Sequence, residues 1–451
     1  MMGTLKKTAV IGLAVSNTPL IRYLVEQGAQ VTVFDKKSSE ELQNYLGKLS
    51  DLKLEYCLGD DYLSHLHGFD SIYVTPGMKK DLPELQRARS EGAVFSSEME
   101  LFFEKCPGQI TGITGSSGKT TTTTLIGLMM ASAFPATFVG GNIGRSLMDQ
   151  LPAMNQSSKV VLELSSFQLQ TVSKSPQLSI ITNITPNHLD IHASMEEYIQ
   201  AKSNILQYQS EKDIAILNYD NEITRGLSDK VKGKLYYFSR KRNLDEGACL
   251  EDDKLVIRLN GQTEVLTTRN RLKLLGDHNV ENILTASLAA RINGVPLENL
   301  TPVVEEFSGV EHRLEFIREK NGVLFYNDSI STTPDRAIAG LMAMTRPTIL
   351  IAGGYDKHLP FDKLAPVIVN QCKHLVVIGV TGPQIIAAVR NFREDFPITP
   401  VKTFEEAVET ATKLAGPGQV VLLSPACASY DMFKNYQERG TLFKNLVNAM
   451  G

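Results

Sequence analysis

The sequence has no tryptophan and only five cysteines among its 451 residues. The cysteines are scattered and none belongs to a C-x-x-C pair: Cys57, Cys106, Cys249, Cys372 and Cys427. An odd number of widely spaced cysteines disfavours both a disulfide framework and a cysteine-ligated zinc site. We therefore expect reduced thiols and a cytoplasmic protein.

Long apolar runs and blocks of like charge are also missing. No stretch reaches the ~20 apolar residues of a membrane span, and no long apolar core follows residues 1–7, as it would in a secretory signal. The formal net charge is only -4, so nothing indicates nucleic acid or an anionic membrane as a partner. We expect small-molecule ligands and, from the chain length, two or three domains.

A glycine- and serine-rich loop joins an apolar strand to a helix over residues 110–121, ITGITGSSGKTT. Glycines let successive backbone NH groups point inward, and the helix N-terminus adds partial positive charge, so such a loop cradles phosphate. The pattern G-x-x-x-x-G-K-[ST] is matched imperfectly, because Ile113 replaces its first glycine. We interpret it as a variant nucleotide loop; the alternative is a chance turn before an amphipathic helix. The predicted nucleotide ligands are Gly115, Ser116, Ser117, Gly118, Lys119, Thr120 and Thr121, with Lys119 on the terminal phosphates and Thr120 on Mg²⁺.

Residues 1–97 predict a first α/β domain with strands at 8–13, 29–34, 70–74 and near 92. Its first strand leads into GLAVSN, which has one glycine where a dinucleotide fingerprint has three, so we do not expect NAD. Asp35 ends the second strand and is placed to accept hydrogen bonds from a ribose or a base; the alternative is a solvated turn. Residues 75–77, Thr-Pro-Gly, end another strand at the edge where α/β folds bind ligands.

Residues 98–309 predict the nucleotide-binding domain. Glu163 ends the strand at 159–164 and would be the second protein ligand of the Mg²⁺, with an exposed, functionless glutamate as the alternative. His188 follows the strand at 178–184 and is a candidate metal or substrate ligand, whereas Lys202 is expected to be solvated. A β-rich stretch from residue 213 precedes the helix at 280–293, where Asn279 and Asn282 would bind adenine unless Asn279 caps the helix.

Residues 310–451 predict a third α/β domain beyond a hinge at 308–309. Its expected strands are 323–326, 348–352, 374–378 and 419–423, and each ends in a polar cluster. Four such strand ends predict a second ligand-binding rim, which we expect to face the nucleotide.

The motifs taken together resemble the Mur ligase family, the ATP-dependent amide-forming ligases of peptidoglycan assembly. The resemblance covers essentially the whole chain and rests on TGSSGKTT (114–121), GNIG (141–144), ELSSFQ (163–168), NHLD (187–190), residues 198–202 and EHR (311–313). The run SPACASYDMF (424–433) with NYQERG (435–440) resembles the branch of the family that adds D-glutamate.

The resemblance implies a fold, substrates and site residues. It implies a Rossmann-like N-terminal domain, a central P-loop ATPase-type domain with a parallel sheet plus a small β sheet, and a Rossmann-like C-terminal domain. The family implies ATP and two Mg²⁺ ions as cofactors. The metal ions would be held by Thr120, Glu163, His188 and a carbamylated Lys202. The catalytic residues would be Lys119, His188 and Lys202. ATP would also contact Asn279, Asn282, Arg313 and Asp328. UDP-N-acetylmuramoyl-L-alanine would contact Val15, Ser16, Asp35, Thr75, Pro76, Gly77 and Asn142, and D-glutamate would contact Thr332, Lys357, Ser429, Tyr430 and Tyr436.

The sequence departs from the commoner family pattern at a few positions. Ile330 stands where a lysine is usual, Thr333 where an asparagine is usual, Asn17 replaces a glycine and Tyr436 replaces a frequent phenylalanine. The resemblance implies a monomeric cytoplasmic enzyme. Its alternatives are another Mur-type ligase, a folylpolyglutamate-type ligase, or a nucleotide-regulated binding protein that hydrolyses ATP without forming an amide.

Overall fold

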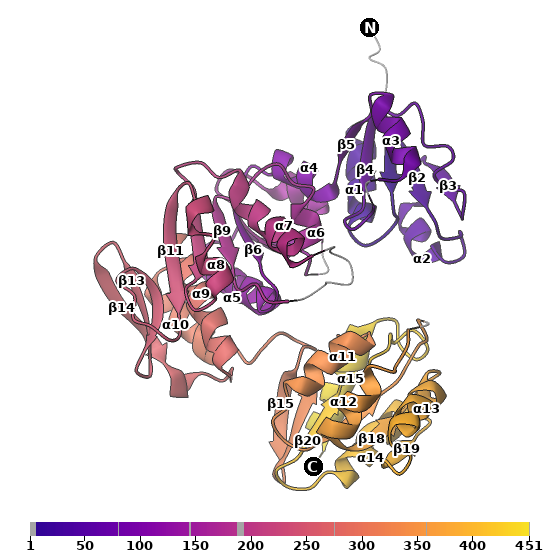
Figure 1. Ribbon diagram of the computed structural model, residues 1–451, viewed down its shortest axis with the longest axis vertical. Coiled ribbons are helices and arrows are strands. Elements are labelled where there is room, and N and C mark those ends of the chain that lie inside the picture. Colours follow the sequence, from indigo (N-terminus) through magenta and orange to yellow (C-terminus); the bar gives the residue numbers. More distant parts are fainter. Residues whose placement is uncertain are drawn as a thin grey trace. The chain divides into compact units, whose positions relative to one another are not determined.

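The computed structural model describes residues 6–79, 81–143, 146–186, 194–274, 276–357 and 359–450. The predicted α/β class is confirmed, with three largely parallel sheets (Figure 1). The chain divides into two compact units, Met1–Phe307 and Ser308–Gly451. The first unit holds two sheets and the second unit holds one; we keep 1–97, 98–309 and 310–451 as proposed domain limits. No helix among the described residues has the length and apolar character to span a membrane.

The first sheet has the strand order β3-β2-β1-β4-β5, all parallel. Its elements are β1 (Lys7–Ile11), α1 (Asn17–Glu26), β2 (Gln30–Asp35), α2 (Gln43–Leu46), β3 (Glu55–Leu58), β4 (Ser71–Val74), α3 (Pro83–Ser90) and β5 (Val94–Ser96). The chain order reverses between β1 and β4, and in open α/β sheets the loops after two such strands are the usual place where ligands bind. Edge strand β3 was not predicted, because its half-exposed residues EYCL carry little apolar signal.

The second sheet has nine strands in the order β14-β13-β12-β11-β10-β9-β6-β8-β7. Its strands are β6 (Gln109–Thr114), β7 (Thr137–Gly141), β8 (Lys159–Glu163), β9 (Leu178–Ile181), β10 (Ile214–Asn218), β11 (Lys234–Ser239), β12 (Gly247–Glu251), β13 (Lys254–Leu259) and β14 (Gln262–Thr268). Its helices are α4 (Glu98–Lys105), α5 (Lys119–Ala131), α6 (Ser166–Leu169), α7 (Met195–Gln207), α8 (Glu222–Arg225), α9 (Asp277–Ile292) and α10 (Leu297–Glu306).

The β-rich stretch after residue 213 belongs to this second sheet and does not form the separate small sheet that we expected. Strands β10 and β11 continue the parallel part, and β11 pairs in parallel with β12. The antiparallel strands β13 and β14 then extend the edge. The unpredicted strand β12 supplies the continuity, because it pairs with the parallel part on one side and the antiparallel part on the other.

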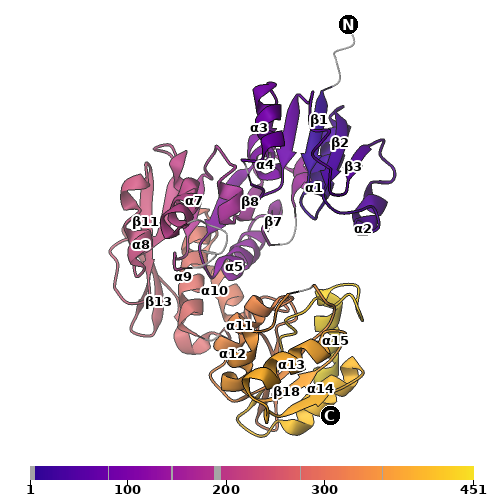
Figure 2. The ribbon, with the colours of Figure 1, turned by 45° about the vertical axis from the view of Figure 1, so that its right-hand side comes forward.

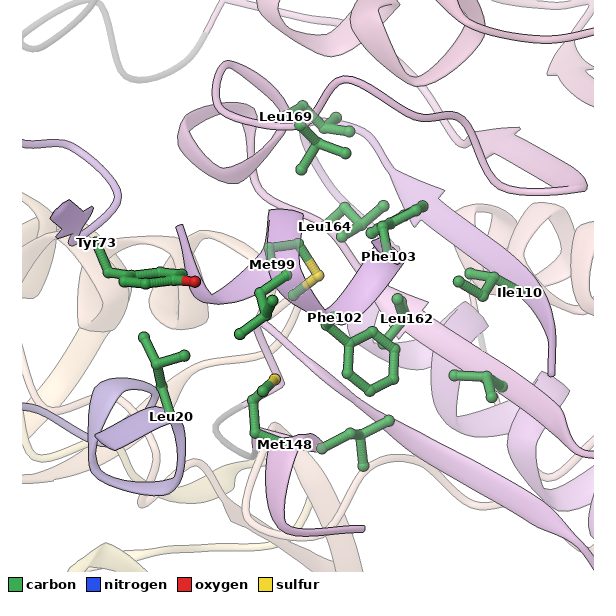
Figure 3. Close-up of a cluster of buried hydrophobic side chains, with 14 of the residues drawn as sticks. Leu20, Tyr73, Met99, Phe102, Phe103, Ile110, Met148, Leu162, Leu164 and Leu169 are labelled. Carbon is green, nitrogen blue, oxygen red and sulfur yellow. The ribbon is translucent and has the colours of Figure 1, made fainter. Parts of the chain in front are cut away.

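The first two sheets share one hydrophobic core. Leu20 of α1 and Tyr73 of β4 belong to the same buried cluster as Met99 of α4 and Met148 of the 3₁₀ helix η2 (Met148–Ala153). Figure 3 shows Leu20 and Tyr73 on one side of the two methionines, with Phe102, Leu162 and Leu164 on the other. Burial of these side chains joins the two sheets into the single unit described above.

The third sheet has the order β15-β16-β20-β17-β18-β19, with β15 antiparallel at one edge. Its strands are β15 (Glu315–Lys320), β16 (Val323–Asn327), β17 (Thr348–Ala352), β18 (Cys372–Val377), β19 (Ile398–Pro400) and β20 (Val420–Leu423). One core cluster contains residues of α11 (Pro334–Met342), α12 (Leu364–Gln371) and α13 (Gly382–Phe392), and another contains residues of α14 (Phe404–Leu414) and α15 (Tyr436–Ala449). Helices therefore cover both faces of this sheet (Figure 2).

Candidate active site

The glycine- and serine-rich loop connects β6 to α5, as predicted. Strand β6 lies between β8 and β9, all parallel, so the loop opens where the carboxyl ends of three strands meet. Gly118 has φ +80°, the left-handed region that glycine adopts without strain, and a Cβ there would lie 2.3 Å from Oδ1 of Asn282. The close approach of Asn282 explains why the loop needs glycine before Lys119.

Residues after β9 hold the loop in shape. Asn183 accepts hydrogen bonds from the backbone NH of Ser117 (3.0 Å) through its side chain and from the backbone NH of Ser116 (2.8 Å) through its carbonyl. The Thr182 hydroxyl donates to the carbonyl of Ser117 (2.7 Å). Lys119 Nζ donates to the carbonyls of Gly115 (2.8 Å) and Ser116 (3.2 Å), so its ammonium lies over the loop. A cation at this point faces any phosphate that the loop accepts.

Helix α9 brings two predicted adenine ligands to the loop. The Thr122 hydroxyl donates to Oδ1 of Asn282 (3.3 Å), and Nδ2 of Asn282 donates to Oδ1 of Asn279 (3.1 Å). The N-cap of α9 is Gly276, so the capping role considered for Asn279 is wrong. Both asparagines therefore lie beside the nucleotide loop, although their contact with adenine stays a prediction.

Glu163 at the end of β8 is buried and has one carboxylate oxygen without a partner. Its Oε1 accepts a hydrogen bond from Nδ2 of Asn142 (2.9 Å), which also places Asn142 at this site. Among the described residues no donor contacts Oε2, although this atom is buried. A buried carboxylate oxygen beside the nucleotide loop is a suitable ligand for Mg²⁺, whose preferred ligands are oxygens. Glu163 is 3% exposed, so the alternative of a glutamate at an exposed strand end is wrong, and its role as a Mg²⁺ ligand stays a prediction.

Lys202 on α7 is buried, with 2% of its surface exposed, so the expectation of a solvated lysine is wrong. Burial and, to a smaller extent, the nearby Lys119 lower the pKa of Lys202 to about 7, against the opposing effect of Glu163. The Lys202 ammonium lies 4.5 Å from the ring centre of Tyr198, whose hydroxyl is 3.1 Å from Oγ of Ser116. The lysine therefore lies at the nucleotide site, and a large fraction of its amine is uncharged at neutral pH.

The structure gives less information about the remaining predicted metal ligands, Thr120 and His188. Thr120 is buried in the first turn of α5. His188 belongs to residues 187–193, which lie outside the described part of the chain. Within the described ranges no group of three His, Cys, Asp or Glu residues could hold a metal ion. The Mg²⁺ ligands would therefore have to include a hydroxyl, a modified lysine or the nucleotide itself.

The motif residues 165–168 have a structural role. The Ser165 hydroxyl accepts from the backbone NH of Gln168 (3.2 Å), and Oε1 of Gln168 accepts from the backbone NH of Ser165 (2.9 Å). This capping box starts helix α6 directly after β8. It fixes the direction of the chain where Glu163 ends its strand.

All of the predicted UDP-contacting residues except Asn142 lie at the carboxyl ends of β1, β2 and β4. Asn142 lies after β7, beside Glu163. Gly12 approaches Thr75 so closely that a Cβ would lie 3.1 Å from the Thr75 Cβ. Both oxygens of Asp35 accept backbone hydrogen bonds, from Leu13 (2.6 Å) and Lys37 (2.9 Å), so this carboxylate orders the loops after β1 and β2. Nδ2 of Asn17 donates to the carbonyls of Ile11 and Gly12, which shows what this departure from the family pattern does.

The predicted rim in the third sheet centres on a buried carboxylate. Asp328, 3% exposed, accepts hydrogen bonds from the hydroxyls of Ser331 (2.5 Å) and Ser424 (2.8 Å) and from the NH of Leu314 (3.2 Å). Burial raises its pKa to about 6 against these hydrogen bonds. Asp328 thus joins the ends of β16 and β20 and the turn that carries Arg313.

The predicted acceptor-binding residues lie on three strand-end loops of this second unit. Tyr355 pairs with Ala428 as an isolated bridge, and its ring packs edge-on against Tyr430 at 5.8 Å. Ser429 is buried, whereas Tyr430 and Lys357 are exposed. Tyr436 begins α15, and its carbonyl accepts the Ser329 hydroxyl (2.7 Å). Thr332 lies in the loop between β16 and α11.

All five cysteines are free thiols, as predicted. Cys427 lies on the rim but is buried, and burial raises its pKa to about 11. A thiol so rarely ionised is a poor nucleophile. A packing role is therefore favoured for Cys427.

Several residues at these sites have no signal in the sequence alone. Asn183 and Tyr198 both lie near recognisable motifs, but only the tertiary fold brings them into contact with the nucleotide loop. Arg439 lies within the NYQERG run and is the largest fully buried side chain among the described residues. An arginine between Glu438 and Gly440 gives no indication of burial.

Comparison with known proteins agrees with this architecture. Three family models match: the Mur ligase MurD-like N-terminal domain over residues 6–96, the Mur ligase middle domain over 113–290 and the Mur ligase glutamate ligase domain over 312–427. The UDP-N-acetylmuramoylalanine–D-glutamate ligase of Acetivibrio thermocellus is 49% identical, and that of Ruminiclostridium cellulolyticum 44% identical; each alignment covers 99% of this chain and 97% of the relative.

A solved structure with the same fold is the UDP-N-acetylmuramate-alanine ligase from Thermotoga maritima, with a TM-score of 0.58 and 19% identity over 99% of this chain and 100% of that one. The fold and the loop define a nucleotide-binding α/β enzyme. The chain belongs to the Mur ligase family.

Proposed function

We propose that this protein is an ATP-dependent ligase that adds D-glutamate to UDP-N-acetylmuramoyl-L-alanine through an acyl phosphate. The observation that carries the proposal is the convergence of the nucleotide loop, Glu163 and a buried Lys202 at the carboxyl ends of β6 and β8. The full-length similarity to D-glutamate ligases supports the choice of substrates.

The chain's own groups fit phosphoryl transfer to a carboxylate. The loop NH groups and Lys119 stabilise negative charge on the transferring phosphoryl group. Thr120 and Glu163 would hold Mg²⁺, which supplies further charge stabilisation when bound. The substrate carboxylate takes the phosphoryl group, the amine of D-glutamate attacks the carbonyl carbon, and inorganic phosphate leaves as the amide forms.

The low pKa of Lys202 favours its carbamylation. An uncharged amine attacks CO₂, and about half of this amine is uncharged near pH 7 given a pKa of about 7. The product carries an anionic oxygen ligand in place of a cation, so repulsion by Lys119 becomes attraction. The carbamate would then join Glu163 as a metal ligand, and His188 would serve a second Mg²⁺ ion.

The direct test is phosphate release by purified protein with Mg²⁺, ATP and UDP-N-acetylmuramoyl-L-alanine. D-Glutamate, L-glutamate, L-lysine and meso-diaminopimelate are added one at a time. Release that depends on both the acyl substrate and D-glutamate is the expected result. Release with another amine would reassign the enzyme to another Mur-type or folylpolyglutamate-type reaction, and release without any amine would favour a nucleotide-regulated ATPase.

We further propose that the enzyme acts as a monomer in the cytoplasm. Free cysteines and soluble small-molecule substrates support this placement. Sedimentation velocity at catalytic concentrations tests the monomer directly. A concentration-independent dimer would overturn it.

A further inference from the structure

The buried Arg439 joins the strand-end loops that follow β16, β17 and β20. Its Nε donates to Oγ of Ser329 (3.0 Å) and one terminal nitrogen donates to the carbonyl of the same residue (2.9 Å), after β16. The other contacts are to the carbonyls of Cys427 (3.1 Å) and Ala428 (3.2 Å), after β20. Gly354, after β17, approaches so closely that its Cβ would lie 3.4 Å from the guanidinium.

Arg439 is a buried positive charge without an ion pair. All four hydrogen bonds go to neutral oxygens, and no carboxylate of the described residues lies within ion-pair distance. Burial lowers its pKa to about 10, so the guanidinium stays charged at neutral pH. A buried cation of this kind is unfavourable by itself and favours a nearby anion.

Two further cations lie close to these loops. Lys357 follows β17 by five residues, and in the described part of the chain its ammonium makes no hydrogen bond or ion pair. Arg336, in the first turn of α11, is exposed, and its one polar contact among the described residues is a long one of 3.5 Å to the carbonyl of Ile330. The pKa of Lys357 is lowered mainly by partial burial and then by the charge of Arg336, with a smaller effect of Arg439. Arg336 and Arg439 are therefore both close enough to Lys357 to act on its charge.

The acids near these cations do not neutralise them. Asp356 accepts a hydrogen bond from Gln384 (2.9 Å). Asp431 lies near Arg439 and Cys427, and its Oδ2 is 3.4 Å from the NH of Val380. Asp335 precedes Arg336 on the exposed side of α11. Among the described residues none of these acids forms an ion pair with Arg336, Lys357 or Arg439. The cations of the rim are therefore not paired with any described carboxylate of this chain, as expected of a site for an anion.

We propose that Arg336 is a substrate-binding residue that determines specificity for a dicarboxylic acceptor. Its guanidinium pairs with the side-chain carboxylate of the amino acid and Lys357 pairs with the α-carboxylate, near the buried charge of Arg439. Because Ile330 stands where a lysine is usual in the family, the loop after β16 has no cation at that position. Arg336, on the neighbouring helix α11, supplies one. The inference rests on the proposed function for the identity of the acceptor, D-glutamate.

The test compares Arg336→Gln, Arg336→Lys and a matched control, Arg390→Gln, which changes another exposed helix arginine of the same unit. Loss of a charge-assisted pair of ~1.5–3 kcal/mol corresponds to roughly 10- to 150-fold. We expect Arg336→Gln to raise KM for D-glutamate by that factor, with KM for ATP and for the acyl substrate unchanged. Arg336→Lys should recover part of the loss, and Arg390→Gln should behave as wild type.

D-Glutamine gives the readout that a merely structural role would not change. It has the same shape as D-glutamate but lacks the side-chain charge, so Arg336→Gln should reduce the preference for D-glutamate over D-glutamine at least about tenfold. An unchanged preference, in a variant with the wild-type melting temperature, would overturn the inference.

Wild-type protein is assayed first with the full set of acceptors, which separates this inference from the proposed function. If it uses a different dicarboxylic amine, the proposed substrate is wrong, but the same variants then test Arg336 with that amine. If the only acceptor has one carboxylate, both are overturned.

Discussion

Glu98 is a buried carboxyl at the junction between the first two sheets, and it predicts a measurable pH dependence of stability. It is the first residue of α4 and is 4% exposed. Burial raises its pKa from 4.5 to about 7, opposed by a 2.6 Å hydrogen bond from the Ser146 hydroxyl. We expect Glu98→Gln to stabilise the protein above pH 7 and to have little effect near pH 4.

The direction follows from proton linkage. Between pH 4.5 and 7 the folded protein binds more protons at Glu98 than the unfolded chain does, so stability falls as pH rises through this window and is constant above it. A rise of about 2.5 pKa units at ~1.4 kcal/mol each gives an upper limit of about 3 kcal/mol. Glutamine keeps an acceptor for Ser146 and has no charge to bury, so it avoids this cost.

Thermal unfolding of wild type, Glu98→Gln and Glu100→Gln between pH 4.5 and 8.5 measures the effect. At ~2 °C per kcal/mol for a large domain, the melting temperature of Glu98→Gln should exceed that of wild type by up to about 6 °C at pH 8.5 and by little at pH 4.5. Glu100, more exposed on the same helix, is the control and should show no comparable trend. A difference between Glu98→Gln and wild type that is constant with pH, or grows toward acid, would refute the reasoning.

Three further substitutions test the nucleotide site. Lys119→Ala should abolish phosphate release with the melting temperature preserved, because it removes the ammonium that lies over the loop; full activity would refute the loop assignment. Lys202→Ala should be inactive and partly restored by short-chain carboxylates, and undiminished activity without them would exclude a carbamate ligand. Gly118→Ala should raise KM for ATP at least about tenfold, because its Cβ would lie 2.3 Å from Asn282 at a strained φ of +80°; an unchanged KM would show that the loop can shift.

The sequence was sufficient to predict the elements that carry the nucleotide site. The strand at 159–164 and the glycine loop both leave strong local signals, and the structure places the strand within one residue of the prediction and the loop between β6 and α5. Edge strands β3, β15 and β19 were missed because their residues are mixed or half exposed, which is the weakest pattern for a strand. The interior strand β12 was missed because its sequence, GACLE, is short and mixed in polarity.

Burial of charged residues was the part that local patterns did not reveal. Lys202 lies on an amphipathic helix where a lysine is normally solvated, and only the packing of α7 against the nucleotide loop buries it. Arg439 and Glu98 are buried for the same kind of reason, by contacts with loops far away in the sequence. Charge placement therefore depends on tertiary structure, whereas strand and loop positions depend mostly on neighbouring residues.

These buried charges share a physical consequence. Glu163 has a buried oxygen without a partner in the described part of the chain, Lys202 lies beside another cation, and Arg439 has only neutral acceptors. Each arrangement is unfavourable in the ligand-free protein, because desolvation of the charge is incompletely offset. A ligand of opposite charge removes part of that cost when it binds, in addition to making its own contacts. The sites are thus built at the expense of stability, and bound substrates should stabilise both units through mass action, because the relief of this cost is part of their affinity.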